Sequence, residues 1–443
     1  MTNLHITHEW SSYDDARVEV GKTTARVGIF LDNYCLTKNE DIWSKTIRDQ
    51  MHVSLYPLAM WFASSWWRLH YEVLPDSTRA APSHDWRMSH EMAAANMGFV
   101  WPKIMFSADS DSVQIWAQSS QVNKEESARF LNGLDHAHSI SKVQFTHEIS
   151  SLIGHVLARL HEVGCKDSDL AAIWGFIRED LKNPVELRKR RIEAELGFDP
   201  ENCPERLIVE AIALEEKIGA SSFSELTGAY ADSGENRLGA MQKLVDAVGL
   251  EGKPDDILDI SIEETGRAPW EVAVSAAREL RRNLGDANGA LDSSTLRGLL
   301  GLSEAGLKSW IPRGRPRASV AGPDSDKAMK IIPRKTHPIA QRFELARFVG
   351  DYVRSKNKSP HSWLVSADLS TSRQKFQRAF AAELLCPINS LVGYLGGDFS
   401  ETAVEDAADH FMVSEKTVDS LLVNNGYFPR SAPDSGMPYS LAS

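Results

Sequence analysis

The stretch RFELARFVGDYV at residues 342–353 decides the fold of the last third of this 443-residue chain. Its small and apolar residues recur every three or four positions, which is the spacing of one face of an α-helix. The stretch FAAELLCP at residues 380–387, with the residues just before it, repeats this spacing. We therefore expect two core helices, each with one polar side, that pack together.

The same two stretches resemble the ImmA/IrrE-like metallopeptidase family. Residues 342–353 are similar to the family's RFtlAHElGHyl helix, which carries its HExxH zinc motif, and residues 380–387 are similar to its FAAELLMP helix. The family usually continues with a short helix-turn-helix element, which residues 404–422 fit. The resemblance implies a mainly helical ImmA/IrrE-like domain over residues 266–430. Its helical opening would correspond to the PWE of residues 269–271, with residues 276–280 and 296–301.

The positions that would perform zinc chemistry in this family have been replaced. Aligning Ala346 with the family's alanine places Arg347 at the first histidine, Phe348 at the catalytic glutamate and Asp351 at the second histidine. Arginine has no lone pair to give to a metal, and phenylalanine cannot accept a proton. The third ligand would come from residues 374–378, whose sequence QKFQR contains no carboxylate. The resemblance therefore implies a pseudopeptidase with no catalytic residues, no metal and no cofactor.

Arg347 and Asp351 are four residues apart on the expected helix, where opposite charges face one another. One interpretation is a buried salt bridge, in which the guanidinium replaces the charge of the zinc ion. The other is an exposed pair, which contributes only about 0.2–0.5 kcal/mol. The sequence leaves both interpretations open.

The composition is typical of a folded protein that is surrounded by water. The chain has 42% hydrophobic and 25% charged residues, which is close to the average for globular domains. No apolar run approaches the roughly 20 residues that span a bilayer, and residues 1–10 lack the features of a secretory signal. We expect a cytoplasmic protein with no membrane partner. The four cysteines are dispersed without a CxxC pair, which argues against a zinc ribbon and a disulfide framework.

Residues 1–140 are predicted to form an α+β domain of unknown function with a small antiparallel sheet. Alternating apolar residues in 16–31 suggest a hairpin around Gly21-Lys22, and residues 99–106 with 113–117 suggest a second hairpin. Between them, residues 55–71 have the spacing of one helix. The fold class as a whole is therefore expected to be α+β.

Two features of this first region suggest possible sites. Eight of the twelve tryptophans lie in it and could form a stacking platform for bases or a peptide groove, but burial in a core explains them better, and we expect most of them to be core residues. The polar group of His84, Asp85, Arg87 and His90 beside Trp86 suggests an enzyme site. The alternative is that this group only caps a helix at Ser89.

The remaining regions are assigned by periodicity and composition. Residues 141–252 are predicted to form an all-α middle region, and residues 252–259, rich in Gly, Pro and Asp, a connection. Residues 312–323, PRGRPRASVAGP, are predicted to be an exposed loop because proline and glycine disfavour helices and central strands. The tail at 431–443 is polar and contains proline, and is predicted to be disordered.

Residues 308–358 reverse the acidic balance of the chain. They contain thirteen Lys or Arg against four Asp or Glu, whereas the whole chain has a net charge of −12. This stretch is the one credible surface for an anion such as DNA. Its predicted contacts, together with one lysine in the helix-turn-helix element, are Arg313, Arg315, Arg317, Arg334, Lys335 and Lys416.

Three functions follow from these observations. The first is a non-catalytic regulatory or adaptor protein that binds a protein partner, in the prokaryotic stress, mobile-element or phage-defence circuits in which active relatives of the family cleave repressors. The second is a DNA-binding transcriptional regulator, although the expected recognition helix offers only Lys416 beside two acidic residues. The third is an enzyme with a site in the N-terminal domain.

Overall fold

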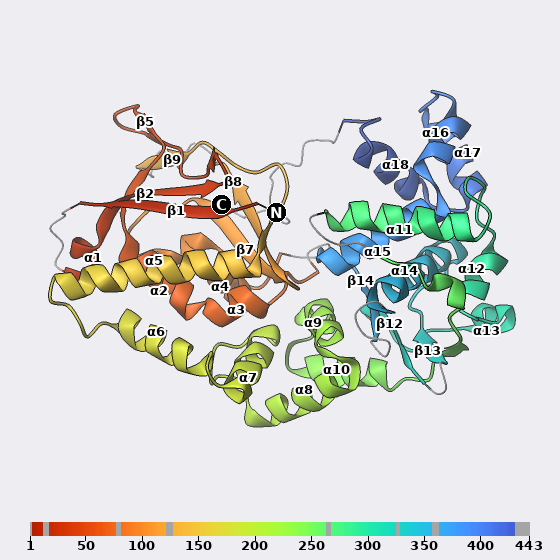
Figure 1. Ribbon diagram of the computed structural model, residues 1–443, viewed down its shortest axis with the longest axis horizontal. Helices are drawn as coiled ribbons and strands as arrows, with labels where there is room; N and C mark the ends of the chain where they lie inside the picture. Colours follow the sequence, from red (N-terminus) through yellow and green to blue (C-terminus); the bar gives the residue numbers. More distant parts are fainter. Residues whose placement is uncertain are drawn as a thin grey trace. The chain divides into compact units, whose positions relative to one another are not determined.

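The computed structural model describes residues 2–11, 17–76, 81–120, 127–262, 267–324, 328–356 and 363–429. The chain divides into two compact units, one up to Val209 and the other from Glu210. Each unit combines helices with small antiparallel sheets (Figure 1), so the predicted α+β class is confirmed. The division falls inside helix α8, Glu205–Ile218.

The N-terminal unit is built on a four-stranded antiparallel sheet. Its strands are β1 (Leu4–Trp10), β2 (Thr24–Leu31), β3 (Tyr34–Cys35) and β6 (Met51–Ser54), with β2 paired to the other three. Ala25, Val27, Ile29 and Leu31 of β2 enter the core on one face of the sheet, whereas Arg26 is exposed and Phe30 half-buried on the other face. Helix α5 (Lys142–Glu162) contributes its apolar residues to the same core.

Two smaller sheets and several helices complete this unit. One sheet has the order β10-β8-β7 (His138–Ser141, Ser112–Gln118, Lys103–Asp109), and the other has the order β5-β4-β9 (Ile47–Arg48, Asn39–Asp41, Ala128–Phe130). The helices are α1 (Val18–Lys22), α2 (Leu55–Ser64), α3 (Trp66–Tyr71), α4 (His84–His90), η1 (Met92–Ala95), α6 (Asp169–Asp180) and α7 (Pro184–Glu195).

The hairpin predicted for residues 99–106 and 113–117 is confirmed by β7 and β8, but two other predictions for this unit are wrong. The first strand of the hairpin predicted for 16–31 is instead α1, whose last turn is closed by hydrogen bonds from Thr23 and Thr24 to the carbonyls of Glu19 and Val20. Alternation over so few residues does not separate a strand from one helical turn. The single helix predicted for 55–71 is divided at Ser65 into α2 and α3.

The C-terminal unit contains a four-stranded antiparallel sheet of order β11-β13-β12-β14. These strands are Leu250–Gly252, Met329–Ile332, Ala318–Pro323 and Leu364–Ala367. Around them lie α9 (Ala220–Ala229), η2 (Ala231–Asn236), α10 (Arg237–Val245), η3 (Asp256–Leu258), α11 (Pro269–Asn283), α12 (Ser293–Leu299), α13 (Glu304–Ser309), α14 (Pro338–Lys356) and α15 (Ser372–Leu385). The last three helices are α16 (Ile388–Leu395), α17 (Glu401–Phe411) and α18 (Glu415–Asn424).

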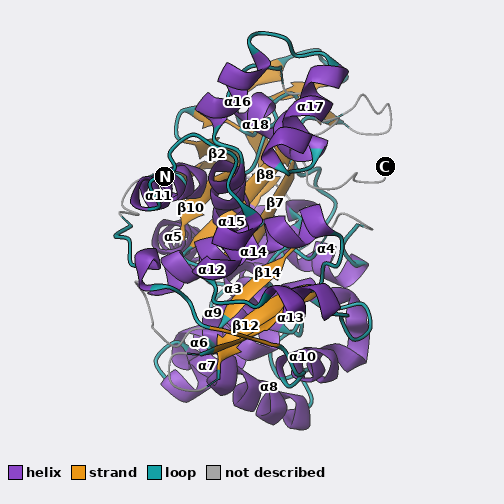
Figure 2. Cartoon of the chain, turned by 90° about the vertical axis from the view of Figure 1, so that its right-hand side faces the viewer, coloured by secondary structure: helices purple, strands orange, loops and turns teal. Residues whose placement is uncertain are grey.

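Helices α14 and α15 are the two packed core helices predicted from their apolar spacing. Both border β14 in the C-terminal unit (Figure 2). At Gly350 a Cβ atom would come within 2.8 Å of the ring of Phe380, so the absence of a side chain at residue 350 allows the close approach of the two helices. Phe348, which the resemblance aligns with a catalytic glutamate, is fully buried in this core.

The predicted helix-turn-helix element is present as α17 and α18. Met412 ends α17 in the left-handed conformation, and the Ser414 hydroxyl accepts a hydrogen bond from the backbone N–H of Thr417 at the start of α18. Ser, Thr, Asp and Asn are the residues preferred at this capping position.

Other predicted boundaries differ from the structure. The middle region 141–252 is divided, because α5 to α7 belong to the N-terminal unit and α9 and α10 to the C-terminal unit. Residues 250–252, placed at the end of that region, form a strand that pairs with β13. The loop predicted for 312–323 ends as strand β12, whose residues 318–322 are buried between β13 and β14. The tail at 431–443 lies outside the described residues. Among the described residues, no helix combines the length and apolarity required to cross a membrane.

Candidate functional site

Helices α14 and α15 bring several polar residues together beside the edge strand β14, among them the positions that the resemblance aligns with the zinc motif. Arg347 and Asp351 lie one turn apart on α14, and both are buried, so the exposed-pair interpretation is wrong. On α15, Arg373, Gln374 and Gln377 are also buried. These five polar side chains meet in the interior of the C-terminal unit.

Four of the five side chains, those of Arg347, Asp351, Gln374 and Gln377, satisfy the outer backbone groups of β14. Asp351 accepts a hydrogen bond from the N–H of Val365 at 3.1 Å, and the amides of Gln374 and Gln377 donate to the carbonyl of the same residue. Arg347 donates to the carbonyl of Ala367, whose N–H donates to Gln374. An edge strand otherwise presents such groups unpaired. The side chains therefore occupy the place of a neighbouring strand.

Asp351 is paired with Arg373 and not with Arg347, which corrects the sequence prediction. Two parallel contacts join the guanidinium of Arg373 to the carboxylate, at 2.8 Å and 2.7 Å. Burial opposes the charge of Arg373, but the adjacent carboxylate of Asp351 outweighs it and raises the pKa of the guanidinium. Spacing along one helix allows an Arg347–Asp351 pair, whereas the forked geometry of Arg373 on the next helix makes two bonds at once.

Arg347 is instead a buried cation held mainly by neutral groups. It donates hydrogen bonds to Gln374 and to the carbonyl of Ala367, while the carboxylate of Asp368 lies 3.9 Å away. Its Nε has no hydrogen-bond partner among the described residues. Burial lowers the pKa of Arg347 to about 9, and the charges of Arg378 and Arg334 act in the same direction.

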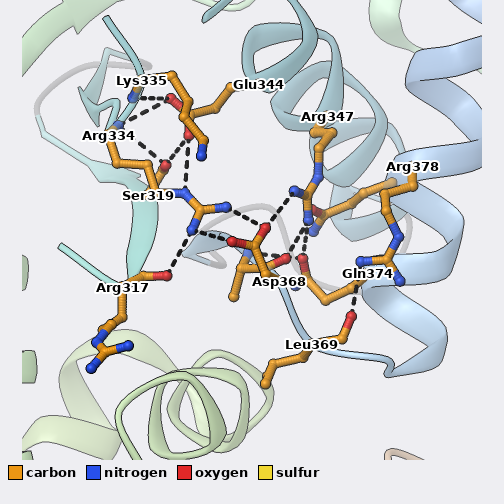
Figure 3. A network of polar contacts seen from close by, with 12 residues as sticks. Arg317, Ser319, Arg334, Lys335, Glu344, Arg347, Asp368, Leu369, Gln374 and Arg378 are labelled. Atoms are coloured by element: carbon orange, nitrogen blue, oxygen red, sulfur yellow. Dashed lines mark hydrogen bonds and ion pairs between the residues drawn. The ribbon is translucent and has the colours of Figure 1, made fainter. Parts of the chain in front are cut away.

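Asp368 lies between Arg347 and a second arginine, Arg334 (Figure 3). Arg334 makes a two-point contact with Asp368 at 2.7 Å and 2.8 Å, and its Nε lies 3.3 Å from Glu344. Burial disfavours the charge of Asp368, but the hydrogen bonds and charge of Arg334 outweigh it and lower the pKa of the carboxyl to about 2. Glu344 also accepts a hydrogen bond from Ser319 on β12, so α14 is joined to the sheet.

Helix α9 supplies a further wall of the polar interior. Glu225 on α9 accepts hydrogen bonds from Thr371 at 2.7 Å and from the amide of Gln374 at 2.8 Å. Ser222, one turn earlier, donates to the carbonyl of Trp363. The polar sides of α14 and α15 are therefore covered by protein at this position.

The residues at the three motif positions do not fit a zinc ion, which takes about three protein lone-pair donors. Arg347 has none, and the carboxylate of Asp351 is already bound by Arg373 and by a backbone N–H. The side-chain oxygen of Gln374 accepts from Arg347 and Ala367. In the part of the chain that the structure describes, no group of three or more His, Cys, Asp or Glu residues is arranged to hold a metal.

The residues predicted to contact DNA do not share one environment. Arg313 and Arg315 are exposed in the loop before β12, and Arg317 lies 3.8 Å from Asp232. The guanidinium of Arg334 is almost fully buried against Asp368 and Glu344, and the backbone N–H of Lys335 also donates to Glu344. Lys416 begins α18 between the acidic Glu415 and Asp419. Arg334 is therefore not available for phosphate contacts.

Two residues of the candidate enzyme site, His90 and Asp85, are linked through the buried Glu72–Arg68 ion pair. His90 is fully buried, stacks on Trp86, and contacts Glu72 and the carbonyl of Phe106 through its two ring nitrogens. Asp85 pairs with Arg68. Arg87 pairs with Glu91, and His84 begins α4 after the Ser83 cap. Ser89, the alternative capping residue, is buried within α4.

The predicted stacking platform is not supported, because the tryptophans that suggested it belong to the core. Trp61, Trp66, Trp67, Trp86, Trp101 and Trp116 are all buried. Trp43 differs, with 82% of its surface exposed at the tip of the hairpin that joins β4 and β5.

Sequence reasoning did not identify Arg373, Asp368, Glu225 and Arg378 as parts of the polar interior. Arg378 donates to the carbonyl of Leu369 (Figure 3), and burial lowers its pKa. A polar residue on a helix is normally expected to face solvent. The buried strand β14 beside these helices is too short to be recognised from a pattern of apolar residues. One signal was available, because Arg373 lies directly before the segment in which a third ligand was sought.

Comparison with family models, with curated proteins and with solved structures finds no match to this chain.

Proposed function

We propose that this protein is a non-catalytic, ImmA/IrrE-like regulatory or adaptor protein that binds a protein partner in prokaryotic stress, mobile-element or phage-defence regulation. One observation carries the proposal. The positions where an active relative would hold zinc are occupied by Arg347 and Asp351, and both are engaged in buried hydrogen bonds. A group that needs free lone pairs finds none there.

The convergence of the motif positions supports the resemblance on which this proposal rests. Residue 347 on α14 contacts residue 374 on α15, within the segment where the resemblance requires a third ligand, and residue 351 contacts the preceding residue, 373. The residue types present at these positions support the loss of peptidase activity, because arginine and phenylalanine supply neither a metal ligand nor a general base.

Metal analysis with a restored variant tests the loss of catalysis. The wild-type protein, purified without chelator, is expected to contain no stoichiometric zinc and to cleave no co-expressed partner. The matched comparison combines Arg347→His, Phe348→Glu, Asp351→His and Gln374→Glu, which recreates three ligands and a base. Near-stoichiometric, tightly held zinc in the wild-type protein would refute the proposal.

Co-expression with the products of neighbouring genes tests the adaptor role. A regulatory protein of this kind is expected to co-purify with one such product at a fixed stoichiometry and to leave its length unchanged. Shortening of the partner in the presence of wild-type protein, but not in its absence, would contradict a non-catalytic role.

DNA binding remains the alternative proposal. It can be tested by changing the arginines in and beside the loop before β12. If DNA is bound, reversing the charges of Arg313, Arg315 and Arg317 should lower the slope of log affinity against log salt by about 0.9 for each lost phosphate contact. We expect no measurable affinity in the wild-type protein, because Arg334 is withdrawn into the interior and the start of α18 is acidic.

A further inference from the structure

The face of the N-terminal sheet that points away from the core carries charged and polar residues. Arg26 on β2 lies opposite Glu9 on β1 and opposite His52 on β6 in the strand register. Because side chains alternate along a strand, these residues share one face with Phe30, whereas Ala25, Val27, Ile29 and Leu31 enter the core. The side chain of Arg26 is 66% exposed.

A cavity of about 770 Å³, partly open to solvent, lies on this face. Its lining residues come from β2, β6 and the end of the β4–β5 hairpin, whose strand β5 is labelled in Figure 1. They are Arg26, Phe30, Arg48, Asp49, Gln50 and His52. Cavities that bind small ligands commonly enclose about 300–1,000 Å³, so this one has room for a ligand of nucleotide size.

Phe30 provides an aromatic surface in the cavity because Gly28 leaves room for it. A Cβ atom at residue 28 would lie 2.5 Å from the ring of Phe30 and 2.8 Å from the hydroxyl of Thr7. The ring therefore lies over the backbone of Gly28, against the sheet. Phe30 is only partly buried, so part of the ring remains accessible from the cavity.

The charged groups around the ring favour an anionic ligand. Arg26 and Arg48 contribute two guanidinium groups, against one carboxylate from Asp49 in the lining, and the charge of Asp41 also acts on Arg48. Glu9 lies 3.6 Å from Arg26, but both side chains are largely exposed, and surface pairs of this kind are weak and easily exchanged. His52 is held by a 2.8 Å contact with the hydroxyl of Ser11.

We propose that this cavity binds a nucleobase together with its phosphate, with the base against Phe30 and the phosphate between Arg26 and Arg48. An aromatic ring on an exposed sheet face, flanked by arginines, matches both parts of such a ligand. Asp49 and Gln50 supply polar groups for the edge of the base. The proposal concerns the N-terminal unit and does not depend on the function proposed for the C-terminal unit.

The test measures binding of full-length protein to two probes, a mononucleotide such as AMP and a ten-nucleotide oligo(U), by calorimetry and fluorescence anisotropy. Binding of AMP would assign a free nucleotide as the source of the ligand, and binding of oligo(U) alone would assign a single strand. Failure of both probes, also with AMP replaced by GMP and UMP, would overturn the proposal.

Substitutions then test whether a bound probe occupies this cavity. Phe30→Leu is expected to weaken binding by at least about fivefold, since stacking on an aromatic side chain contributes about 1–3 kcal/mol per base. Phe176→Ala, at a phenylalanine that is 72% exposed on α6, is the matched control and should bind normally.

Charge variants give a second, independent measurement. Arg48→Glu changes an exposed side chain and should retain the fold even if Phe30→Leu does not. It is expected to weaken both probes and to lower the salt slope of oligo(U) binding by about 0.7, whereas Arg282→Glu on the exposed side of α11 should not. Equal affinity of wild type, Phe30→Leu and Arg48→Glu for a bound probe would overturn the proposal.

Discussion

The C-terminal unit encloses its charged groups around Arg347 and Asp351, whereas Arg26 and Arg48 of the N-terminal unit line a cavity that is partly open to solvent. In the closed site, backbone and side-chain groups satisfy most of the hydrogen-bonding capacity, and the edge of β14 is covered. In the cavity of the N-terminal unit, the side chains of Arg26 and Arg48 are exposed to solvent. The difference fits a C-terminal arrangement that stabilises the fold and the ligand site that we propose for the N-terminal unit.

Removing the carboxylate of Asp351 from the buried polar site of the C-terminal unit is expected to have the largest effect on stability. Asp351→Ala leaves Arg373 buried without its partner, and breaking such a pair costs about 3–5 kcal/mol of unfolding free energy. Chemical denaturation measures it. Glu179→Ala, in an exposed pair with Lys182, is the control and should leave the free energy of unfolding almost unchanged. A loss for Asp351→Ala as small as that of the control would mean that the site is not closed.

A buried histidine of the N-terminal unit tests how strongly the interior of this unit disfavours an added charge. Burial lowers the pKa of His70 to about 4, so the unfolded chain binds the proton more readily between about pH 6.5 and 4. The contribution of neutral His70 is therefore complete above pH 6.5 and is lost as the pH falls to about 4, at a cost of the order of 2–3 kcal/mol. His70→Gln should remove this part of the pH dependence of stability. An unchanged profile would indicate that His70 is accessible to protons in the folded state.

Arg347→Met is expected to change stability by at most about 1 kcal/mol. The substitution removes a desolvated cation, and this gain offsets the lost hydrogen bonds to Ala367 and Gln374. In double-mutant cycles, Asp351 should couple to Arg373 by well over 1 kcal/mol and to Arg347 by nearly zero. Strong coupling between Asp351 and Arg347 would restore the salt bridge that the sequence suggested.

How much the sequence predicts depends on how local the signal is. The spacing of Phe343, Ala346 and Val349 predicts helix α14 and its buried face, and the same reasoning predicts α15 and the helix-turn-helix pair. The spacing of Arg347 and Asp351 does not predict their partners, because Arg373 and Gln374 come from another helix and β14 supplies backbone groups.

The open cavity of the N-terminal unit could not be predicted from the sequence for a similar reason. Its lining joins Arg26 and Phe30 on one strand with Arg48 and His52 near another, and only the antiparallel register brings Arg26 and His52 side by side. The tryptophans, which gave the strongest aromatic signal, are used mainly for the core. The smaller Phe30 becomes accessible because the residue two positions earlier is glycine.

The smallest expected effect belongs to the open face. Arg48→Ala should change the free energy of unfolding by no more than about 0.5 kcal/mol, the usual range for exposed positions without special contacts. Arg26→Ala also removes the exposed contact with Glu9 and should still cost less than about 1 kcal/mol. Urea denaturation of both variants and of Asp351→Ala under the same conditions allows their free energies of unfolding to be compared directly. A loss above about 2 kcal/mol for Arg48→Ala would show that the residue supports the sheet, and weaker nucleotide binding by its variants would then reflect damage to the fold. If Arg48→Ala leaves the free energy of unfolding almost unchanged and weakens nucleotide binding, the charged groups of the two units have different roles. Those of the C-terminal unit then stabilise the folded chain, and those of the N-terminal cavity bind a ligand.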